Sequence, residues 1–366
     1  MKRIAAAGLF SLCSLFAGAL AAQPNSLPDS LPSSLPNTDW TAINLAVTDA
    51  QVIPSYTSFA AAAEELKVAA AGFCANITAD SLSALQAQFH TTMDGWQGVQ
   101  HLQFGPITYF NWNFRIQYWP DDNGTGARQM NAILAAQDAA VLAPETFARQ
   151  SVGVQGFQAL EGLLFDPTSL ADLQADPYRC QVVQTIAANI AEIATGVTTR
   201  WETEFRTTLA TADERGYFES AEDATIEYLK SLVEPVRRIQ QQKLEAVLGE
   251  NPAAARERRA ESWRSERTLR NIKLNVAALE HLFSAAEPAL SSLLQPADAE
   301  LVDAAFAKLQ GSLNAQPDSL TAALEPEGGH AALLQIAQEL DALYEALEAA
   351  LKNTDLYLGF NSLDGD

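Results

Sequence analysis

The sequence predicts an all-α fold made of two helical bundles, each half resembling a four-helix bundle. Apolar residues recur every three or four positions in 182–205, 269–283 and 333–351, and polar residues fill most of the positions between them. This period is typical of helices that bury one face. The alternation of apolar and polar residues that indicates strands is nearly absent. Helices are therefore expected along most of the chain after residue 40.

The same periodicity predicts further helices at 41–72, 79–103, 145–164, 219–249 and 297–313. The aromatic-rich segment 107–119 is the exception, and we expect it to be extended, or irregular with its rings in the core. A polar turn at 211–220 follows a long helical segment near the middle of the chain. A domain boundary is expected there, which gives an N-terminal bundle, 40–214, and a C-terminal bundle, 215–366.

The N-terminus has the pattern of a secretion signal. Residues 1–22 begin with Lys2 and Arg3, continue with an apolar run and end in a small-x-small site. A membrane anchor is the rival interpretation, but the apolar run is short for a span. Residues 23–39 repeat Ser-Leu-Pro three times and predict a flexible leader. We expect an exported, periplasmic protein without a transmembrane segment in the mature chain.

The mature chain is strongly acidic. Loss of Lys2 and Arg3 with the signal leaves 21 basic against 45 acidic side chains, a formal charge of −24. Nucleic acids and anionic lipids need a basic surface, so both are excluded as expected partners. The charge is compatible with attraction of cations, although solubility explains it more simply.

Familiar catalytic motifs are absent from the sequence. It contains no HExxH, GxSxG or phosphate-binding GxxxxGK[ST] pattern, and no CxxC motif. Two cysteines remain after the signal, Cys74 and Cys180, and they form either a disulfide or two buried thiols. His90 and His101 are three helical turns apart, which is too far to bind one ion without a bend.

One polar pair stands out in the apolar segment GVQGFQALEGLLFD, 153–166. Gln158 and Glu161 are three positions apart and therefore share a helix face. An amide oxygen is a weaker ligand for zinc, iron or copper than an imidazole. The pair predicts either a polar binding site or a hydrogen-bonded network that joins helices.

A basic cluster lies in the second half of this acidic chain. Seven of its basic residues fall within 256–273: Arg256, Arg258, Arg259, Arg264, Arg267, Arg270 and Lys273. We expect most of them to pair with acids such as Glu257, Glu261 and Glu266. One or two are expected to reach a buried polar site. Arg115, Arg128 and Arg264 are the candidate partners of Glu161.

The segment GFQALEGLLF resembles the GxHxxE signature of the imelysin-like family (peptidase M75 type). Gly156 and Glu161 match the signature, and Gln158 takes the place of its histidine. Three further fragments resemble the family in the expected order: WQGVQHLQFGP (96–106), RIQYWPDDNGTGARQ (115–129) and ESWRSERTLRNI (261–272). Together the fragments span most of the mature chain.

The resemblance implies a two-domain helical fold with a site between the domains, near the signature helix. The expected binding residues are Gly156, Gln158, Glu161, Arg115, Arg128, Arg264 and Ser265, and no catalytic residue is assigned. No cofactor is certain; iron or another divalent metal is the candidate, with Glu161 as its expected ligand. The partners implied are iron-uptake or haem-uptake proteins, or other proteins of the envelope.

Three functional hypotheses follow. The first is a periplasmic, non-enzymatic binding or accessory protein in iron or haem acquisition. The second is a metallopeptidase of the imelysin type, which the replacement of the motif histidine by Gln158 disfavours. The third is a structural envelope protein that presents an interaction surface and has no small-molecule pocket.

Overall fold

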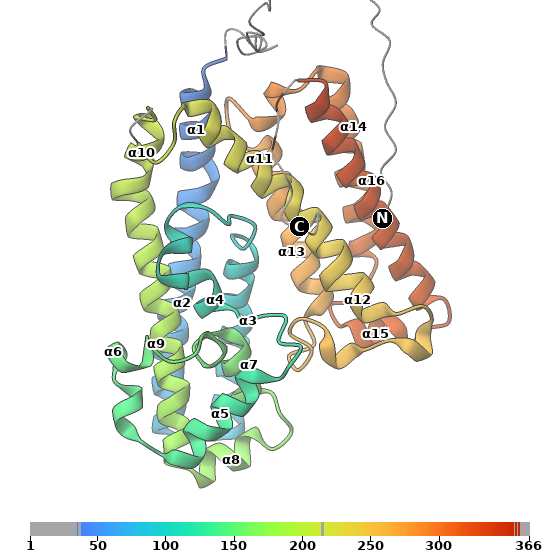
Figure 1. Ribbon diagram of the computed structural model, residues 1–366. Helices are drawn as coiled ribbons and strands as arrows, with labels where there is room; N and C mark the ends of the chain where they lie inside the picture. Colours follow the sequence, from blue (N-terminus) through green and yellow to red (C-terminus); the bar gives the residue numbers. More distant parts are fainter. Residues whose placement is uncertain (1–34, 36–37, 214–215, 355, 357, 359–366) are drawn as a thin grey trace, which may run out of the picture.

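The structure is a computed structural model that describes residues 35, 38–213, 216–354, 356 and 358. The predicted all-α class is confirmed, since the described residues form helices, turns and loops and no strand. Figure 1 shows two columns of helices side by side. The predicted signal, 1–22, and most of the leader lie outside the described residues.

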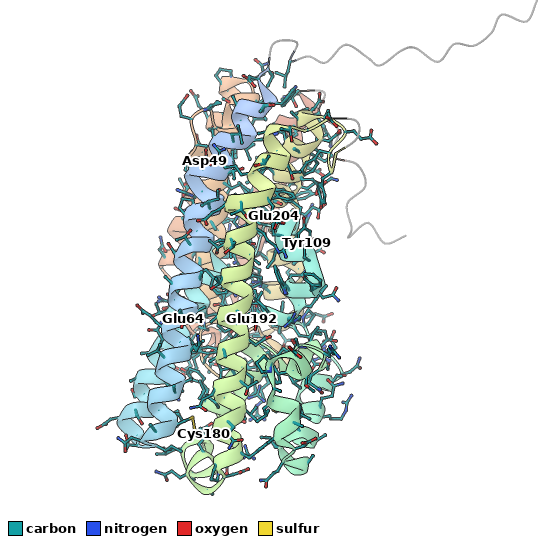
Figure 2. All side chains as sticks on the ribbon, turned by 90° about the vertical axis from the view of Figure 1, so that its left-hand side faces the viewer. Asp49, Glu64, Tyr109, Cys180, Glu192 and Glu204 are labelled. Atoms are coloured by element: carbon teal, nitrogen blue, oxygen red, sulfur yellow. A yellow bond between two sulfur atoms is a disulfide. The ribbon has the colours of Figure 1, made fainter. Side chains whose placement is uncertain are left out.

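The first column is built on three long helices. A continuous helix runs through α1 (Trp40–Val47), the π-helical turn η1 (Thr48–Val52) and α2 (Ile53–Ala75). It packs along α3 (Ala79–Gln97) and α9 (Pro177–Arg200), and α9 continues through η5 (Trp201–Phe205) into α10 (Arg206–Ala210). Figure 2 shows α2 and α9 side by side over most of their length. Local signals set the ends of these helices, because Asp39 and Asp176 cap α1 and α9 and a capping box at Thr78 begins α3.

The second column follows residue 220. It contains α11 (Ala221–Arg238), which continues through η6 (Ile239–Glu245) into α12 (Ala246–Leu248). The other helices are α13 (Thr268–Ser284), α14 (Pro296–Asn314), the short α15 (Leu320–Leu324) and α16 (Gly329–Lys352).

The two columns contact each other through α1 against α11 and α3 against α13. Buried apolar residues of both columns form one continuous cluster. The division into two domains at residue 214 stays a prediction.

Shorter helices cover one side of the first column and supply much of the site. They are α4 (Trp112–Ile116), α5 (Thr125–Ala136), α6 (Pro144–Phe147), α7 (Phe157–Leu164) and α8 (Ser169–Ala175). The single helix expected at 145–164 is wrong, because a 3₁₀ turn, η4 (Val152–Val154), separates α6 from α7. A physical reason is the close packing of the backbones at Gly126 and Gly153, which leaves no room for a Cβ at either.

The aromatic segment is irregular, as one of the two expectations had it, but its rings are not all in the core. It forms the 3₁₀ turn η2 (Gly105–Asn111) followed by α4. Phe110 and Asn111 have left-handed backbones, with φ of 53° and 57°, and the chain turns outward there. Phe110 and Phe114 are consequently 69% and 52% exposed.

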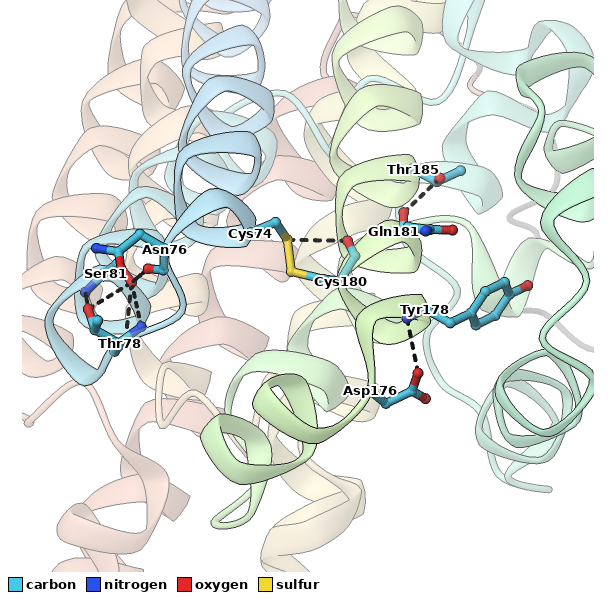
Figure 3. Close-up of a disulfide and its surroundings, with 9 residues drawn as sticks. All are labelled: Cys74, Asn76, Thr78, Ser81, Asp176, Tyr178, Cys180, Gln181 and Thr185. Atoms are coloured by element: carbon cyan, nitrogen blue, oxygen red, sulfur yellow. Dashed lines mark hydrogen bonds between the residues drawn. A yellow bond between two sulfur atoms is a disulfide. The ribbon is translucent and has the colours of Figure 1, made fainter.

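A disulfide joins Cys74 at the end of α2 to Cys180 in the first turn of α9 (Figure 3). Their Cα atoms are 5.7 Å apart, within the usual range for such a bond. The structure contains the disulfide, one of the two alternatives that the sequence left open. It ties together two of the three long helices that support α7.

Candidate functional site

Helix α7 begins at a glycine because another part of the backbone passes against it. A Cβ at Gly156 would collide with the carbonyl oxygens of Arg115 and Ile116 at the end of α4. Gly156 therefore allows α4 and α7 to lie in contact. From this start, Gln158 and Glu161 project from one face of α7 and line the same cavity, of about 130 Å³.

The cavity lies between the two columns. One wall consists of residues from α3, α7 and the segment after α4, and the other consists of residues 258–264 of the second column. The lining residues are Met93, Gln117, Trp119, Pro120, Asp121, Asp122, Gln158, Glu161, Arg258, Arg259, Ala260, Ser262, Trp263 and Arg264. A second cavity, of about 470 Å³, shares Gln158 and four other lining residues with the first.

Glu161 is only 3% exposed, and a serine of the second column satisfies one of its oxygens. Its Oε1 accepts hydrogen bonds from the backbone N–H of Ser265 at 2.9 Å and from the Ser265 hydroxyl at 2.7 Å. Burial raises the pKa of Glu161, and the two bonds from Ser265 oppose that shift. The carboxyl group of Glu161 therefore links the first column to the second through hydrogen bonds.

The loop that presents Ser265 has an unusual backbone. Ser262 and Glu266 both have left-handed conformations, with φ of 52° and 53°, which non-glycine residues rarely adopt. The Thr268 hydroxyl donates to the carbonyl of Glu261, and the Arg267 N–H donates to the carbonyl of Ser262. These bonds hold the loop in the conformation that aims Ser265 at Glu161. Residue type alone gave no sign of these two left-handed positions.

Gln158 differs from Glu161 because its amide oxygen has no partner. Within the part of the chain that the structure describes, Oε1 of Gln158 is buried and accepts no hydrogen bond. A buried acceptor without a donor is unfavourable, so a donor from outside the protein would stabilise the site. Gln158 is therefore the residue of the cavity that most directly indicates a ligand or water.

The structure separates the three arginines that the sequence proposed for Glu161. Arg264 lines the cavity, but its Nε donates to Asp166 at 2.8 Å and its guanidinium lies over the ring of Trp263. Arg115 donates to Gln155 and Asn189, and Arg128 donates to the carbonyl of Asn123 and to Thr125. Neither Arg115 nor Arg128 lines the two cavities. Among the described residues, Ser265 and none of these arginines supplies the hydrogen bonds of Glu161, while the positive charge of Arg264 also opposes the rise in the pKa of Glu161 that burial causes.

The basic cluster pairs with other acids than those expected. Arg267 and Arg270 both bond Asp94 of α3, and Asp318 accepts from Arg270 and Lys273. These aspartates come from distant segments, which the local sequence around 256–273 could not indicate.

A fully buried ion pair is hydrogen-bonded to Gln117, one of the residues that line the cavity. Lys243 of η6 and Glu261 are 3% and 1% exposed, and their charged atoms are 2.8 Å apart. The Lys243 ammonium also donates to Asn275 and Gln100, at 2.7 Å each, and burial lowers its pKa while Glu261 opposes that shift. Gln117, which lines the cavity, donates to Glu261 at 3.0 Å. Sequence analysis missed Lys243, because a lone lysine on a helix usually faces water.

The donors in the cavity do not fit a transition metal. The structure places no group of three His, Cys, Asp or Glu side chains that could hold an ion among its described residues. Both carboxylate oxygens of Asp121 accept backbone N–H groups of Thr125 and Gly126, and Oε1 of Glu161 accepts two bonds. Asp122 also lines the cavity but is exposed, and Gln158 adds only a neutral amide. This set of donors therefore disfavours direct coordination of an iron or zinc ion.

The two histidines of the first column also lie away from the cavity. His90 contacts Arg267, and burial together with this neighbour lowers the pKa of His90 to about 4. His101 is buried, which lowers its pKa to about 3. Neither ring is among the lining residues.

Comparisons with known proteins agree with the resemblance seen in the sequence. The family model described as Imelysin (Peptidase_M75) matches residues 52–348. Iron-regulated protein A of Synechococcus elongatus is 25% identical over 317 residues, which cover 82% of each chain. The crystal structure of an imelysin-like protein from Psychrobacter arcticum superposes with a TM-score of 0.72 at 20% identity, covering 88% of this chain and 97% of that one.

Proposed function

Since the chain belongs to the imelysin family, we propose that it is an exported, periplasmic binding or accessory protein in iron or haem handling, and not an enzyme. A relative named an iron-regulated protein supports the iron-related role. The signal-like residues 1–22 support export. No helix of the described chain is long and apolar enough to cross a membrane.

The observation that carries this proposal is the state of the Gln158 and Glu161 pair. The carboxylate of Glu161, which matches the signature acid, accepts a hydrogen bond from Ser265. Gln158 stands where the signature has a histidine, and both side chains line the cavity between the columns. A cavity with polar groups and no metal ligand set suits reversible binding. At this site the ligand is therefore expected to carry its iron as a compact chelate, because a cavity of about 130 Å³ cannot enclose a haem.

The metallopeptidase hypothesis has less physical support. Hydrolysis by a metal ion needs an ion with an open coordination position and a bound water. The donors around Glu161 do not fit such an ion, as described above. The purely structural hypothesis expects no small-molecule pocket, whereas Gln158 and Glu161 line a cavity of about 130 Å³.

Titration of the purified mature protein with haemin and with ferric chelates tests the proposal. Trp119 and Trp263 line the cavity, so binding is expected to change the tryptophan fluorescence. Gln158→Leu is expected to weaken binding about tenfold, because a buried polar contact is lost. Gln338→Leu, at an exposed position of α16, is the matched control and is expected to bind like the wild type.

The same preparation separates the rival hypotheses. We expect casein to stay intact with and without added zinc or iron. Cleavage that a chelator and Glu161→Ala both abolish would establish the peptidase instead. Failure to bind haemin or any ferric chelate would contradict the iron-handling role.

A further inference from the structure

Two arginines at the cavity have no acidic partner. Arg258 and Arg259 lie in the 3₁₀ turn η8 (Glu257–Arg259), are exposed, and line the cavity. Within the described ranges, no ion pair or hydrogen bond joins either guanidinium to an acid. In contrast, Arg264, Arg267 and Arg270 of the same cluster each bond an aspartate. The guanidinium of Arg258 lies over the ring of Trp263, with 5.7 Å between its Cζ and the ring centroid. Neither Arg258 nor Arg259 is paired with an acid of the described chain, so both can take a carboxylate ligand.

The same cavity is lined by a residue with a buried acceptor, Gln158. Oε1 of Gln158 is buried without a donor, while the neighbouring Oε1 of Glu161 already accepts two bonds from Ser265. Because this oxygen is buried and uncharged, an ammonium beside it would lose its hydration without gaining a counter-charge, whereas a neutral hydroxyl group is buried at lower cost. A complementary ligand therefore carries both a carboxylate and a hydroxyl group.

The space and the walls limit the size of this ligand. A volume of about 130 Å³ corresponds to about four water molecules in the liquid. Trp119, Pro120 and Met93 provide apolar surface in the same cavity. Of the two aspartates that line the cavity, Asp121 has both oxygens occupied by the backbone N–H groups of Thr125 and Gly126, and Asp122 is exposed to solvent. The site suits a compact organic acid better than a large or strongly cationic molecule.

We infer that this cavity binds a small hydroxycarboxylate, whose carboxylate contacts Arg258 and Arg259 and whose hydroxyl group donates to Gln158. The inference rests on the proposed binding function and names the class of ligand for the same site. A hydroxycarboxylate can itself be the chelator that brings iron, but the contacts described here are made to the organic acid alone.

Three dicarboxylates test this inference on the wild-type protein by isothermal titration calorimetry at constant ionic strength. L-Malate has the hydroxyl group, succinate lacks it, and L-aspartate has an ammonium in its place. L-Malate is expected to bind about tenfold more tightly than either of the others, because only it supplies a neutral donor to Gln158. Equal binding of succinate, or tighter binding of aspartate, would overturn the inference.

Matched variants place the carboxylate. Arg258→Gln and Arg259→Gln are each expected to weaken L-malate binding about tenfold. Arg256→Gln removes the same charge from the same exposed segment, but Arg256 does not line the cavity, so its affinity is expected to stay near that of the wild type. If all three variants lost the same affinity for L-malate, the loss would follow from the change in overall charge, and the assigned contacts would be contradicted. Circular dichroism of each variant confirms that it is folded.

The outcomes also separate this inference from the proposed function. A protein that binds haemin or a ferric chelate but no L-malate keeps the iron-related role and refutes the hydroxycarboxylate site. A protein that binds L-malate with the expected variant pattern, but no iron compound, supports the site and refutes the iron-related role.

Discussion

Replacement of Cys74 and Cys180 together by alanine is expected to lower the free energy of unfolding by about 4 to 5 kcal/mol. The disulfide closes a loop of 106 residues that contains α3 to α8 and the site helix α7. In the chain-entropy account, a bond across so long a loop restricts the unfolded chain strongly. Denaturant unfolding of the wild type and the double variant, followed by circular dichroism, measures the difference.

Reduction of the wild-type protein provides the control for this first result. Wild type unfolded in the presence of dithiothreitol is expected to match the double variant, and dithiothreitol is expected to leave the double variant unchanged. If the double variant were as stable as the oxidised wild type, the bond would add nothing to the packing of α2 against α9.

Lys243→Met is expected to destabilise the protein by about 3 to 5 kcal/mol, because it leaves the carboxylate of Glu261 buried without its cation. Both side chains are almost inaccessible to water, and the ammonium also donates to Asn275 and Gln100. Thermal and denaturant unfolding of the variant at neutral pH measure the loss.

Two further variants separate the ion pair from the loss of side-chain volume. Lys243→Met combined with Glu261→Gln is expected to recover much of the stability, since neither of these two positions then carries a buried charge. Lys230→Met, which breaks the partly exposed pair with Glu227, is expected to cost less than about 1 kcal/mol. A double variant no more stable than Lys243→Met would show that the hydrogen bonds, and not the charges, are the larger contribution.

Helical periodicity was sufficient to predict the long helices, because each buries one continuous apolar face. The stripes at 182–205, 269–283 and 333–351 correspond to α9 with η5, α13 and α16, and nearly all their apolar positions are buried. The break inside 145–164 was missed, because close backbone contacts at Gly153 and Gly156 decide it, and those partners are distant in sequence. Helices predicted from local periodicity were therefore correct where one continuous apolar face is buried, and wrong where contacts between distant segments interrupt the helix.

The candidate site could be predicted only in part. Spacing placed Gln158 and Glu161 on one face, and the structure brings both to one cavity. Spacing could not identify Ser265 as the hydrogen-bond partner of Glu161, since that bond depends on the left-handed backbones of Ser262 and Glu266 in the loop. Nor could it pair Lys243 with Glu261 or Arg267 with Asp94, because such pairs form only when the columns meet.

The metal content of the tag-free wild-type protein tests most directly whether the cavity beside Glu161 is a metal centre. The protein is equilibrated with ferrous iron and with zinc, freed of unbound ions by gel filtration, and analysed by mass spectrometry of the elements. We expect much less than one ion per chain, because an amide and a carboxyl bonded to Ser265 make a poor ligand set. One ion per chain in the wild type, lost in Glu161→Ala, would contradict this account.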